Sequence, residues 1–232
     1  MYRKKCRSYT PFDSRSNIGD LTLNHRTVPA PLTQFKSTEK GHVPYTSVMN
    51  DYYSQRASDP GSLLITEATL IAQKAGTPEQ IDAWKEVTYA VNAKGSFIIC
   101  HFSPSTVFKA GFDDVELNAM NEFLINQFIQ DVSNKRRGNI ENRARFALEV
   151  VERPSNRLPG TDESNDFTRE LRYTREDAME VANENGDLVQ PFGRYFSSNP
   201  DLPKKSNENL PLTPYNRSTF YLSSPSQNYQ EL

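Results

Sequence analysis

Apolar residues follow two different spacings along this chain, one typical of buried strands and the other typical of helices. The run "GSLLITEATLI", residues 61–71, is almost continuously apolar and rich in β-branched side chains, which predicts a strand covered on both faces. The run "SFIICHF", residues 96–102, has the same character. Between the two runs, apolar residues at helical spacing indicate a helix, and they are Ile81, Trp84, Val87, Ala90 and Val91. A strand, a helix and a strand in this order predict a βαβ unit with parallel strands and a right-handed crossover.

The ends of this helix carry residues typical of helix caps. Thr77 and Gln80 form a capping-box pattern, and Pro78 falls at the first helical position. Gly95 is placed to end the helix before the next strand. Comparable patterns predict further helices at residues 46–57, 122–132, 142–152 and 174–186.

The strand-like runs number about five, and they lie near residues 27–33, 62–68, 96–102, 112–118 and 187–192. Pro29 cannot donate to a ladder, so it indicates an edge strand or a broken strand. Strands that alternate with helices predict an α/β fold, either a (β/α) barrel or a doubly wound sheet. A closed barrel needs about eight strands, and the roughly nine residues between the third and fourth runs are fewer than a parallel crossover needs. We therefore expect a fold derived from the (β/α)8 TIM barrel, but incomplete.

Composition divides the chain into three parts. Residues 1–18 start with a basic, polar stretch and are expected to form a disordered N-terminal arm. Residues 19–199 hold the predicted elements and form a partial barrel domain. Near residues 153–166 this domain contains a loop or deletion junction rich in Pro, Ser and Asp. Residues 200–232 are rich in Pro, Asn and Ser and are expected to form a C-terminal tail.

Charge and cysteine content argue against several classes of function. The formal net charge of -2 provides no general attraction to nucleic acid. We expect no membrane partner, because no apolar run is long enough to cross a bilayer and none follows the basic start as in a secretory signal. Cys6 lies in a polar stretch and Cys100 in an apolar one, which indicates a reducing, cytoplasmic location without a disulfide framework.

Several blocks of the sequence resemble the Old Yellow Enzyme family of FMN-dependent NAD(P)H oxidoreductases, and its fungal branch in particular. They include "LTLNHRTVPAPLTQF", "YYSQRASDPGSLLITEAT" and "KAGFDDVELNAMNEFLINQFIQDVSNKR", and the matching blocks cover most of residues 17–221 in family order. Segments that family members carry are absent after Gly76, after about Ser105, before Gly138 and at residues 153–161. The resemblance therefore indicates a chain that is internally truncated at the boundaries of its elements.

The resemblance implies an FMN site at the carboxyl ends of the barrel strands, with NAD(P)H as hydride donor. Pro31, Leu32 and Thr33 of "APLT" resemble the segment along the flavin ring, and Thr33 matches the hydroxyl that hydrogen-bonds flavin O4. Without the resemblance, Thr33 would be an ordinary residue at a strand end. Gly193 and Arg194 of "FGRYF" resemble the pair that grips the phosphate. Physical chemistry agrees, because glycine allows close backbone approach and arginine adds a forked cation.

Two further cofactor contacts follow from the same comparison. Ala68 of "LLITEAT" lies in a matching block and is assigned to the cofactor. His101 stands where the family usually has a Gln that binds the pyrimidine edge of the flavin, and imidazole offers one donor or acceptor there in place of a paired amide. Taken alone, His101 would be a structural or an exposed histidine. The family's Arg near flavin N1 belongs to a segment that this chain lacks.

The stretch "VELNAMNEF" matches the part of the family that holds the substrate. Asn118 and Asn121 match the His/Asn pair that grips the carbonyl oxygen of an activated alkene, and two amides can still donate to such an oxygen. Phe123 matches the tyrosine regarded as the proton donor, and a phenyl ring cannot donate a proton. Tyr221 matches an aromatic residue near the substrate pocket, although it could equally pack against the tail.

Two hypotheses about function follow. The first is an FMN-dependent oxidoreductase that takes a hydride from NAD(P)H and reduces an enone or a quinone. The second is a truncated, catalytically inactive paralogue or a wrongly spliced gene product that binds flavin weakly or acts as an interaction protein. An incomplete barrel exposes unpaired strand edges, which predicts association into a homo-oligomer that closes them.

Overall fold

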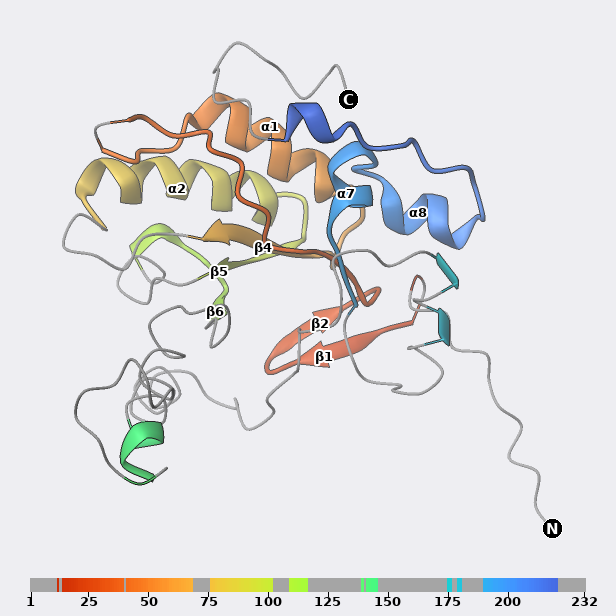
Figure 1. The fold of residues 1–232 in the computed structure, drawn as a ribbon, viewed down its shortest axis with the longest axis horizontal. Helices are drawn as coiled ribbons and strands as arrows, with labels where there is room; N and C mark the ends of the chain where they lie inside the picture. The colour runs from red at the N-terminus through yellow and green to blue at the C-terminus, as the bar shows by residue number, and fades with distance from the viewer. Residues whose placement is uncertain are drawn as a thin grey trace.

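The fold consists of short parallel strands and the helices that pack on them, and we describe it from a computed structural model (Figure 1). The structure describes residues 12, 14–39, 41–68, 76–101, 109–116, 139, 141–145, 175–176, 179–180 and 190–220.

The first described strands form an antiparallel hairpin of β1 (Ser16–Ile18) and β2 (Leu21–Leu23). Residues 16–18 lie in the range that we expected to be a disordered arm, and for these residues that expectation is wrong. The physical reason is burial: Leu23 is fully buried in a core cluster, and the partly buried Ile18 and Leu21 pack against it.

Five described strands lie in two parallel sheets and correspond to the five runs found in the sequence. The first sheet pairs β3 (Thr27–Pro29) with β7 (Gln190–Phe192). The second has the order β4 (Leu63–Ala68), β5 (Phe97–His101) and β6 (Asp114–Glu116). β3 is shorter than its run and ends at the proline that cannot donate to a ladder. The βαβ unit is confirmed, because β4 and β5 are parallel with one helix between them.

β5 and β6 are parallel although the chain that joins them, residues 102–113, is short. Its described end, from residue 109, packs against the helix that precedes β5. Ala110 is buried, and its carbonyl accepts a hydrogen bond of 2.7 Å from the Thr88 hydroxyl. Phe112 lies 5.5 Å from Trp84 between ring centroids. We expected so short a connection to interrupt the barrel here, but these contacts return the chain to the sheet in the parallel direction.

β3 and β4 lie side by side, which brings the two sheets together. Before the strands, His25 Nε2 and Ser62 Oγ are 2.9 Å apart, and Asn24 N donates to Gly61 O at 3.1 Å. After the strands, Gln34 N donates to the Glu67 carboxylate at 2.7 Å. Because contacts join residues at both ends of the two strands, β3 and β4 run in the same direction. The described strands therefore follow the order β7-β3-β4-β5-β6, with their carboxyl ends at one edge.

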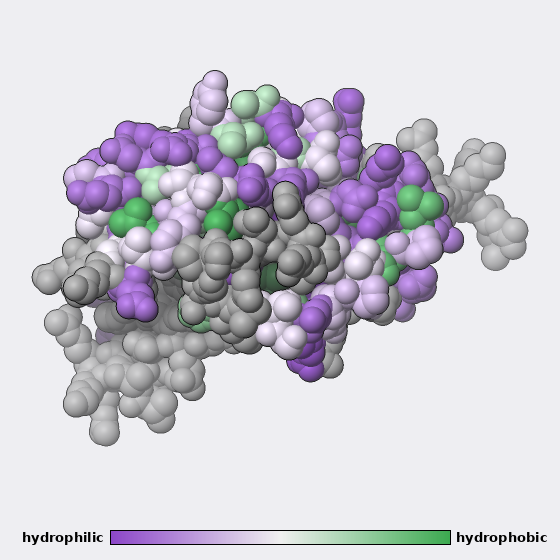
Figure 2. All heavy atoms as spheres, turned by 90° about the horizontal axis from the view of Figure 1, so that it is seen from above, coloured by the Kyte–Doolittle hydropathy of each residue, from purple (hydrophilic) through white to green (hydrophobic). Residues whose placement is uncertain are grey.

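Two helices cover one face of these strands, as the upper part of Figure 1 shows. α1 (Thr46–Arg56) confirms the helix expected at residues 46–57, and α2 (Pro78–Asn92) confirms the helix of the βαβ unit. The capping box of Thr77 and Gln80 is formed, and Gly95 takes the left-handed conformation, φ 71°, that ends the helix. The outer face of the helices is mostly hydrophilic in the view from above (Figure 2).

The core beneath the helices is mainly aromatic and aliphatic. Tyr53 lies between Tyr52 and Trp84, with ring centroids 5.1 and 6.1 Å away. Each large buried apolar side chain contributes about 1.5–3 kcal/mol to folding. The buried members of this cluster are Met49, Tyr52, Tyr53, Ala57, Leu64, Ile81, Trp84, Val87, Val91, Ile98, Cys100, Ala110 and Phe112.

Beyond β7 the chain forms more structure than a tail. α7 (Arg194–Ser198) is followed by α8 (Leu202–Asn207) and by the 3-10 turn η1 (Arg217–Thr219). Leu202 is fully buried in a cluster with Phe192 and Phe196, so the expected tail does not begin at residue 200.

The structure also describes parts of two other predicted helices. Residues 141–145 are helical within the helix expected at 142–152, and residues 175–176 and 179–180 are helical within 174–186. The predicted helix at 122–132 and the junction near 153–166 lie outside the described residues. Within the described ranges, no helix is both long and apolar enough to cross a membrane.

Candidate functional site at the carboxyl ends of the strands

The segment after β3 lies directly beside the segment after β7. Ala30 N donates to Phe192 O at 2.9 Å, which extends the β3–β7 ladder by one bond. Residues 31–33 and residues 193–194 therefore leave the same edge of the sheet as neighbours. Pro31 and Leu32 are half-buried, and Thr33 is exposed. The structure thus brings together the two segments that the sequence assigns to the flavin ring and to its phosphate.

Gly193 and Arg194 form the start of α7. Gly193 is buried with φ -89° and ψ -95°, and its carbonyl accepts a 3.0 Å hydrogen bond from Phe196 N. The Arg194 guanidinium carbon lies 5.9 Å from the centre of the Tyr215 ring, a distance suited to a cation–π contact. The half-buried Arg194 side chain is therefore supported by an aromatic ring at the edge where the strands end.

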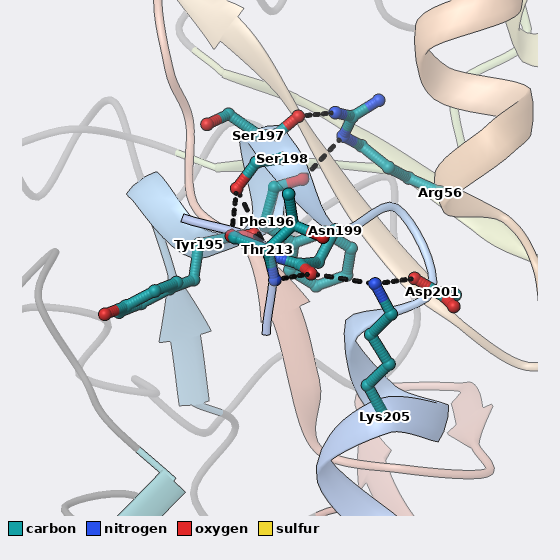
Figure 3. Close-up of polar contacts among 9 residues, drawn as sticks. All are labelled: Arg56, Tyr195, Phe196, Ser197, Ser198, Asn199, Asp201, Lys205 and Thr213. Carbon is teal, nitrogen blue, oxygen red and sulfur yellow. Dashed lines mark hydrogen bonds and ion pairs between the residues drawn. The ribbon is translucent and has the colours of Figure 1, made fainter. Parts of the chain in front are cut away.

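The carboxyl end of α7 is held by Arg56 of α1 (Figure 3). Arg56 Nη2 donates to Ser197 O at 2.7 Å and Arg56 Nε donates to Phe196 O at 3.2 Å. Its Nη1 donates to Tyr52 O at 2.8 Å, and its guanidinium carbon lies 3.6 Å from the centre of the Tyr52 ring. A cation at this end of a helix complements the helix dipole. Arg56 thereby fixes the short helix that begins at Gly193 and Arg194.

Asn199, which is fully buried, binds the returning chain to the end of α7. Its Oδ1 accepts from Thr213 N at 2.8 Å and from Lys205 Nζ at 3.0 Å, and its Nδ2 donates to Thr213 O at 2.9 Å. Ser198 Oγ donates to the same carbonyl at 2.9 Å. Figure 3 shows these bonds meeting between α7, α8 and Thr213. The paired amide contact explains why residues 208–216 follow α8 in an ordered path.

Glu67 stands at the carboxyl end of β4 and faces the segment after β3. Its Oε2 accepts from Gln34 N at 2.7 Å, and its own N–H donates to the Tyr53 hydroxyl at 2.9 Å. Burial raises the pKa of the Glu67 carboxyl, while the backbone N–H groups of Gln34 and Phe35 favour the charged form and lower it in part. Glu67 therefore ties the two sheets together where the site lies.

Ala68 and His101 are partners in the β4–β5 ladder, and both lie at the carboxyl ends of their strands. Ala68 is exposed, whereas His101 is only 5% exposed. His101 N donates to Thr66 Oγ1 at 3.0 Å, and His101 Nδ1 makes a close polar contact with Glu116 Oε2. The sequence left open whether this histidine is structural or exposed, and the structure buries it beside a carboxylate.

The remaining site residues expected from the sequence lie outside the described part of the chain. These are Asn118, Asn121, Phe123 and Tyr221. Among the residues that the structure describes, no group of three or more His, Cys, Asp or Glu side chains could hold a metal ion.

Sequence analysis missed four side chains that organise this edge. Arg56 and Glu67 lie in the blocks "YYSQRASDPG" and "LLITEAT", which supported only the family resemblance. Glu116 lies inside the predicted substrate stretch "VELNAMNEF", two positions before Asn118, and was given no role, and Asn199 was placed at the border of a tail. A charged residue inside or directly after a buried strand was the signal available for Glu67 and Glu116.

Parallel strands with helices packed on one face, and with polar side chains at the carboxyl ends of the strands, define the class as an α/β protein. The family model described as "NADH:flavin oxidoreductase / NADH oxidase family" matches residues 10–107 and 103–159. The chain belongs to this family. It is an Old Yellow Enzyme relative, as the sequence blocks predicted.

Curated relatives match almost the whole chain. Chanoclavine-I aldehyde reductase of Penicillium roqueforti is 29% identical over 348 positions, which cover 93% of this chain and 94% of that protein. 12-Oxophytodienoate reductase 2 of Arabidopsis thaliana is 28% identical, with 100% and 97% covered. A protein named "probable inactive reductase", from Epichloe festucae var. lolii, is also 28% identical, with 91% and 92% covered.

Solved structures show the same fold. The crystal structure of Old Yellow Enzyme from Pichia sp. AKU4542 superimposes with a TM-score of 0.73 at 25% identity, covering 92% of this chain and 91% of that chain. A second structure, titled "TcOYE with pHBA", gives a TM-score of 0.79 at 21% identity, covering 93% and 98%. The fold is therefore that of the (β/α) barrel of this family.

The comparisons also show that this chain lacks segments that its relatives have. The 348 aligned positions exceed the 232 residues of this chain by 116. Because the alignment covers nearly all of both proteins, these unmatched positions of the relative lie opposite internal gaps. The internal truncation inferred from the sequence is thereby supported.

Proposed function

We propose that this chain is an FMN-binding oxidoreductase that takes a hydride from NAD(P)H and reduces an activated alkene such as an enone, or a quinone. The observation that carries the proposal is the hydrogen bond of 2.9 Å from Ala30 N to Phe192 O, because it sets the segments 31–33 and 193–194 side by side at the strand ends. FMN, when bound, supplies the hydride chemistry.

The donors at this edge suit the two ends of such a cofactor. The hydroxyl of the exposed Thr33 would donate to the flavin ring at O4, and Pro31 and Leu32 would line the ring. Arg194 offers a forked cation, and Gly193 lets the backbone approach the phosphate closely. The residues present therefore fit an anionic phosphate and a planar ring.

Two residues would border the pyrimidine edge of the ring. Ala68 leaves room there because its side chain is a single methyl group, and it is exposed. His101 presents imidazole where relatives present an amide, and Glu116 holds its Nδ1. Because the Glu116 carboxylate favours a proton on Nδ1, the His101 imidazole cannot adopt either tautomer equally well.

Substrate would be held by the stretch that follows β6. Asn118 and Asn121 donate hydrogen bonds to the carbonyl oxygen and so polarise the double bond. Phe123 holds no proton, so the carbon α to the carbonyl takes its proton from water. Tyr221 lines the pocket. These assignments rest on the family resemblance.

The wider context belongs to the same proposal. Residues 19–199 form an incomplete barrel domain that lacks the segments present in its relatives, and the protein works in the cytoplasm on a small molecule. Neither nucleic acid nor membrane is a partner. A second copy of the chain closes the strand edges that the missing segments would otherwise cover.

An alternative is a catalytically inactive paralogue or wrongly spliced product that binds flavin weakly or acts as an interaction protein. Two observations favour this alternative. At least 116 positions of the related reductase lie opposite gaps in this chain, and Phe123 stands in place of a proton donor. The similarity to a "probable inactive reductase" agrees with it.

FMN titration of the purified protein separates the two functions. Bound FMN should be retained on gel filtration and released by denaturation, and NADPH should be oxidised when an enone is added. Arg194→Ala should weaken FMN binding about tenfold or more, because a hydrogen-bonded charge is lost. Lys204→Ala, at an exposed position of α8, is the matched control. Protein that binds no FMN would rule out the enzyme. Protein that binds FMN but transfers no hydride would favour the inactive paralogue.

A further inference from the structure

The Glu67 carboxylate receives backbone N–H groups from two successive residues. Gln34 N lies 2.7 Å from Glu67 Oε2, and the N–H of Phe35 also favours the charged carboxylate. Successive backbone N–H groups that converge in this way form an anion-binding concavity. Here the anion is a side chain of the protein itself, contributed by the neighbouring strand.

The backbone conformation at Phe35 agrees with this arrangement. Its φ is 54°, in the left-handed region that is uncommon for a residue with a bulky side chain, and its ring is 51% exposed. The ring therefore gains little from burial that could offset the strained backbone. Such a conformation persists where surrounding contacts enforce it, and Glu67 provides one such contact.

Both sides of Thr33 are anchored. On one side, Gln34 Nε2 donates to Leu32 O at 2.8 Å and to the Tyr52 hydroxyl at 3.2 Å. On the other, Gln34 N donates to Glu67, whose own N–H is bound by the Tyr53 hydroxyl at 2.9 Å. The backbone of residues 32–35 is thus attached to α1 and to β4. Thr33 lies between these anchored residues, and Thr33 itself is exposed.

We propose that Glu67 is a positioning residue that holds the Thr33 hydroxyl toward the cofactor by binding the backbone N–H groups of Gln34 and Phe35. The inference rests on the proposed function for the role of Thr33. Glu67 does not touch the cofactor in this scheme and acts only through the backbone of residues 33–35. A rigid turn lowers the entropy that is lost when the hydroxyl engages its acceptor.

The first test is FMN affinity, measured by quenching of flavin fluorescence in a double-mutant cycle. Glu67→Gln keeps the size of the side chain but removes its charge, and it should weaken FMN binding about tenfold, as expected for loss of hydrogen bonds to a charged group. Thr33→Ala should weaken binding as well. If Glu67 acts through Thr33, the double variant should bind FMN no more weakly than the weaker single variant. Glu86→Gln, an exposed carboxylate of α2, is the matched control and should bind like wild type.

The second test needs no cofactor. Amide hydrogen exchange at Gln34 and Phe35 should be slow in wild-type protein and at least several-fold faster in Glu67→Gln, with Glu86→Gln unchanged. Fast exchange of these two amides in the wild type overturns the inference, so the test holds even if the variant does not fold.

The outcomes separate this inference from the proposed function. Unchanged FMN affinity in Glu67→Gln, or additive losses in the cycle, overturns the positioning role while the oxidoreductase proposal stands. Wild-type protein that binds no FMN refutes the proposed function, and the role of Glu67 toward a cofactor fails with it. In that case faster exchange in Glu67→Gln would still support the anchoring of the turn, and equal exchange would refute it.

Discussion

His101 of β5 and Glu116 of β6 are neighbours across the sheet, and His101 Nδ1 makes a close polar contact with Glu116 Oε2. Their side chains are 6% and 16% exposed, so the contact is largely removed from water. The pair joins the carboxyl ends of two strands of which one, β6, has only three residues. It therefore contributes both to the attachment of β6 and to the orientation of the imidazole at the proposed site.

Glu116→Gln should destabilise the protein by about 1–3 kcal/mol, because it removes one partner of a buried pair. The free energy of unfolding, measured by urea denaturation, checks this value. Combination with His101→Gln should restore part of the loss, since the two amides can hydrogen-bond each other. Additive losses in the two single variants and the double variant would show that the pair is not coupled.

Arg56→Lys should destabilise the protein by about 2–4 kcal/mol, because lysine keeps the charge but cannot reproduce the guanidinium fork that reaches two carbonyls of α7. Arg145→Lys is the matched control, since Arg145 is exposed and bonds Asn142 at 2.7 Å. Thermal unfolding followed by circular dichroism measures both variants. Equal melting temperatures for the two would contradict the role assigned to Arg56.

Asn199→Ala should cost about 2–4 kcal/mol and release the segment that follows α8, because the backbone N–H of Thr213 loses its partner and the Thr213 carbonyl keeps only the Ser198 hydroxyl. Limited proteolysis should then cut near residues 208–216 faster than in the wild type. Asn207→Ala, at an exposed end of α8, should leave the cleavage rate unchanged. Slow cleavage in Asn199→Ala would mean that other contacts hold the segment.

His25 should make the protein sensitive to mild acid. Burial lowers the pKa of His25 below its usual value of about 6.5, although the charge of Asp59 works in the opposite direction. Its Nδ1 is buried, with no hydrogen-bond partner in the described part of the chain. Because the unfolded chain takes up the proton more readily, stability is fully present above about pH 6.5 and declines as the pH falls below it.

His25→Gln removes this dependence, because the amide can still donate to Ser62 Oγ but does not titrate in this range. Unfolding free energies measured between pH 5 and 7 should show a slope smaller by up to about 1.4 kcal/mol per pH unit in the variant. His42→Asn, at an exposed position, should keep the slope of the wild type. Identical slopes in all three proteins would remove His25 as the cause.

Elements whose signals are local in sequence were predicted well. α2 is the clearest case, since its capping box, its first proline and its apolar spacing all lie within residues 77–95 and all operate in the structure. α8 was missed because its six residues, "LPKKSN", carry too few apolar positions to show a period. Its stability comes from the burial of Leu202 against residues of β7 and α7.

The candidate site, too, could be predicted from the sequence only in part. Residues 31–33 and 193–194 could be named from the sequence because they lie in blocks shared with the family. Their proximity could not, because it depends on the pairing of β3 with β7 across more than 150 positions of chain. For Glu67 and Glu116 the signal was only a charged residue at the end of an apolar strand, and it does not single out a site because a lone carboxylate there is usually solvated.

The amino-acid sequence by itself determined the five parallel strands, the capped helix, the family and the internal truncation, because these depend on neighbouring residues or on direct comparison. Only the tertiary structure decided that Glu67 meets Gln34 and that His101 meets Glu116. Strand register and the packing of adjacent strands set these contacts, and register follows from the whole core and not from any local run of residues.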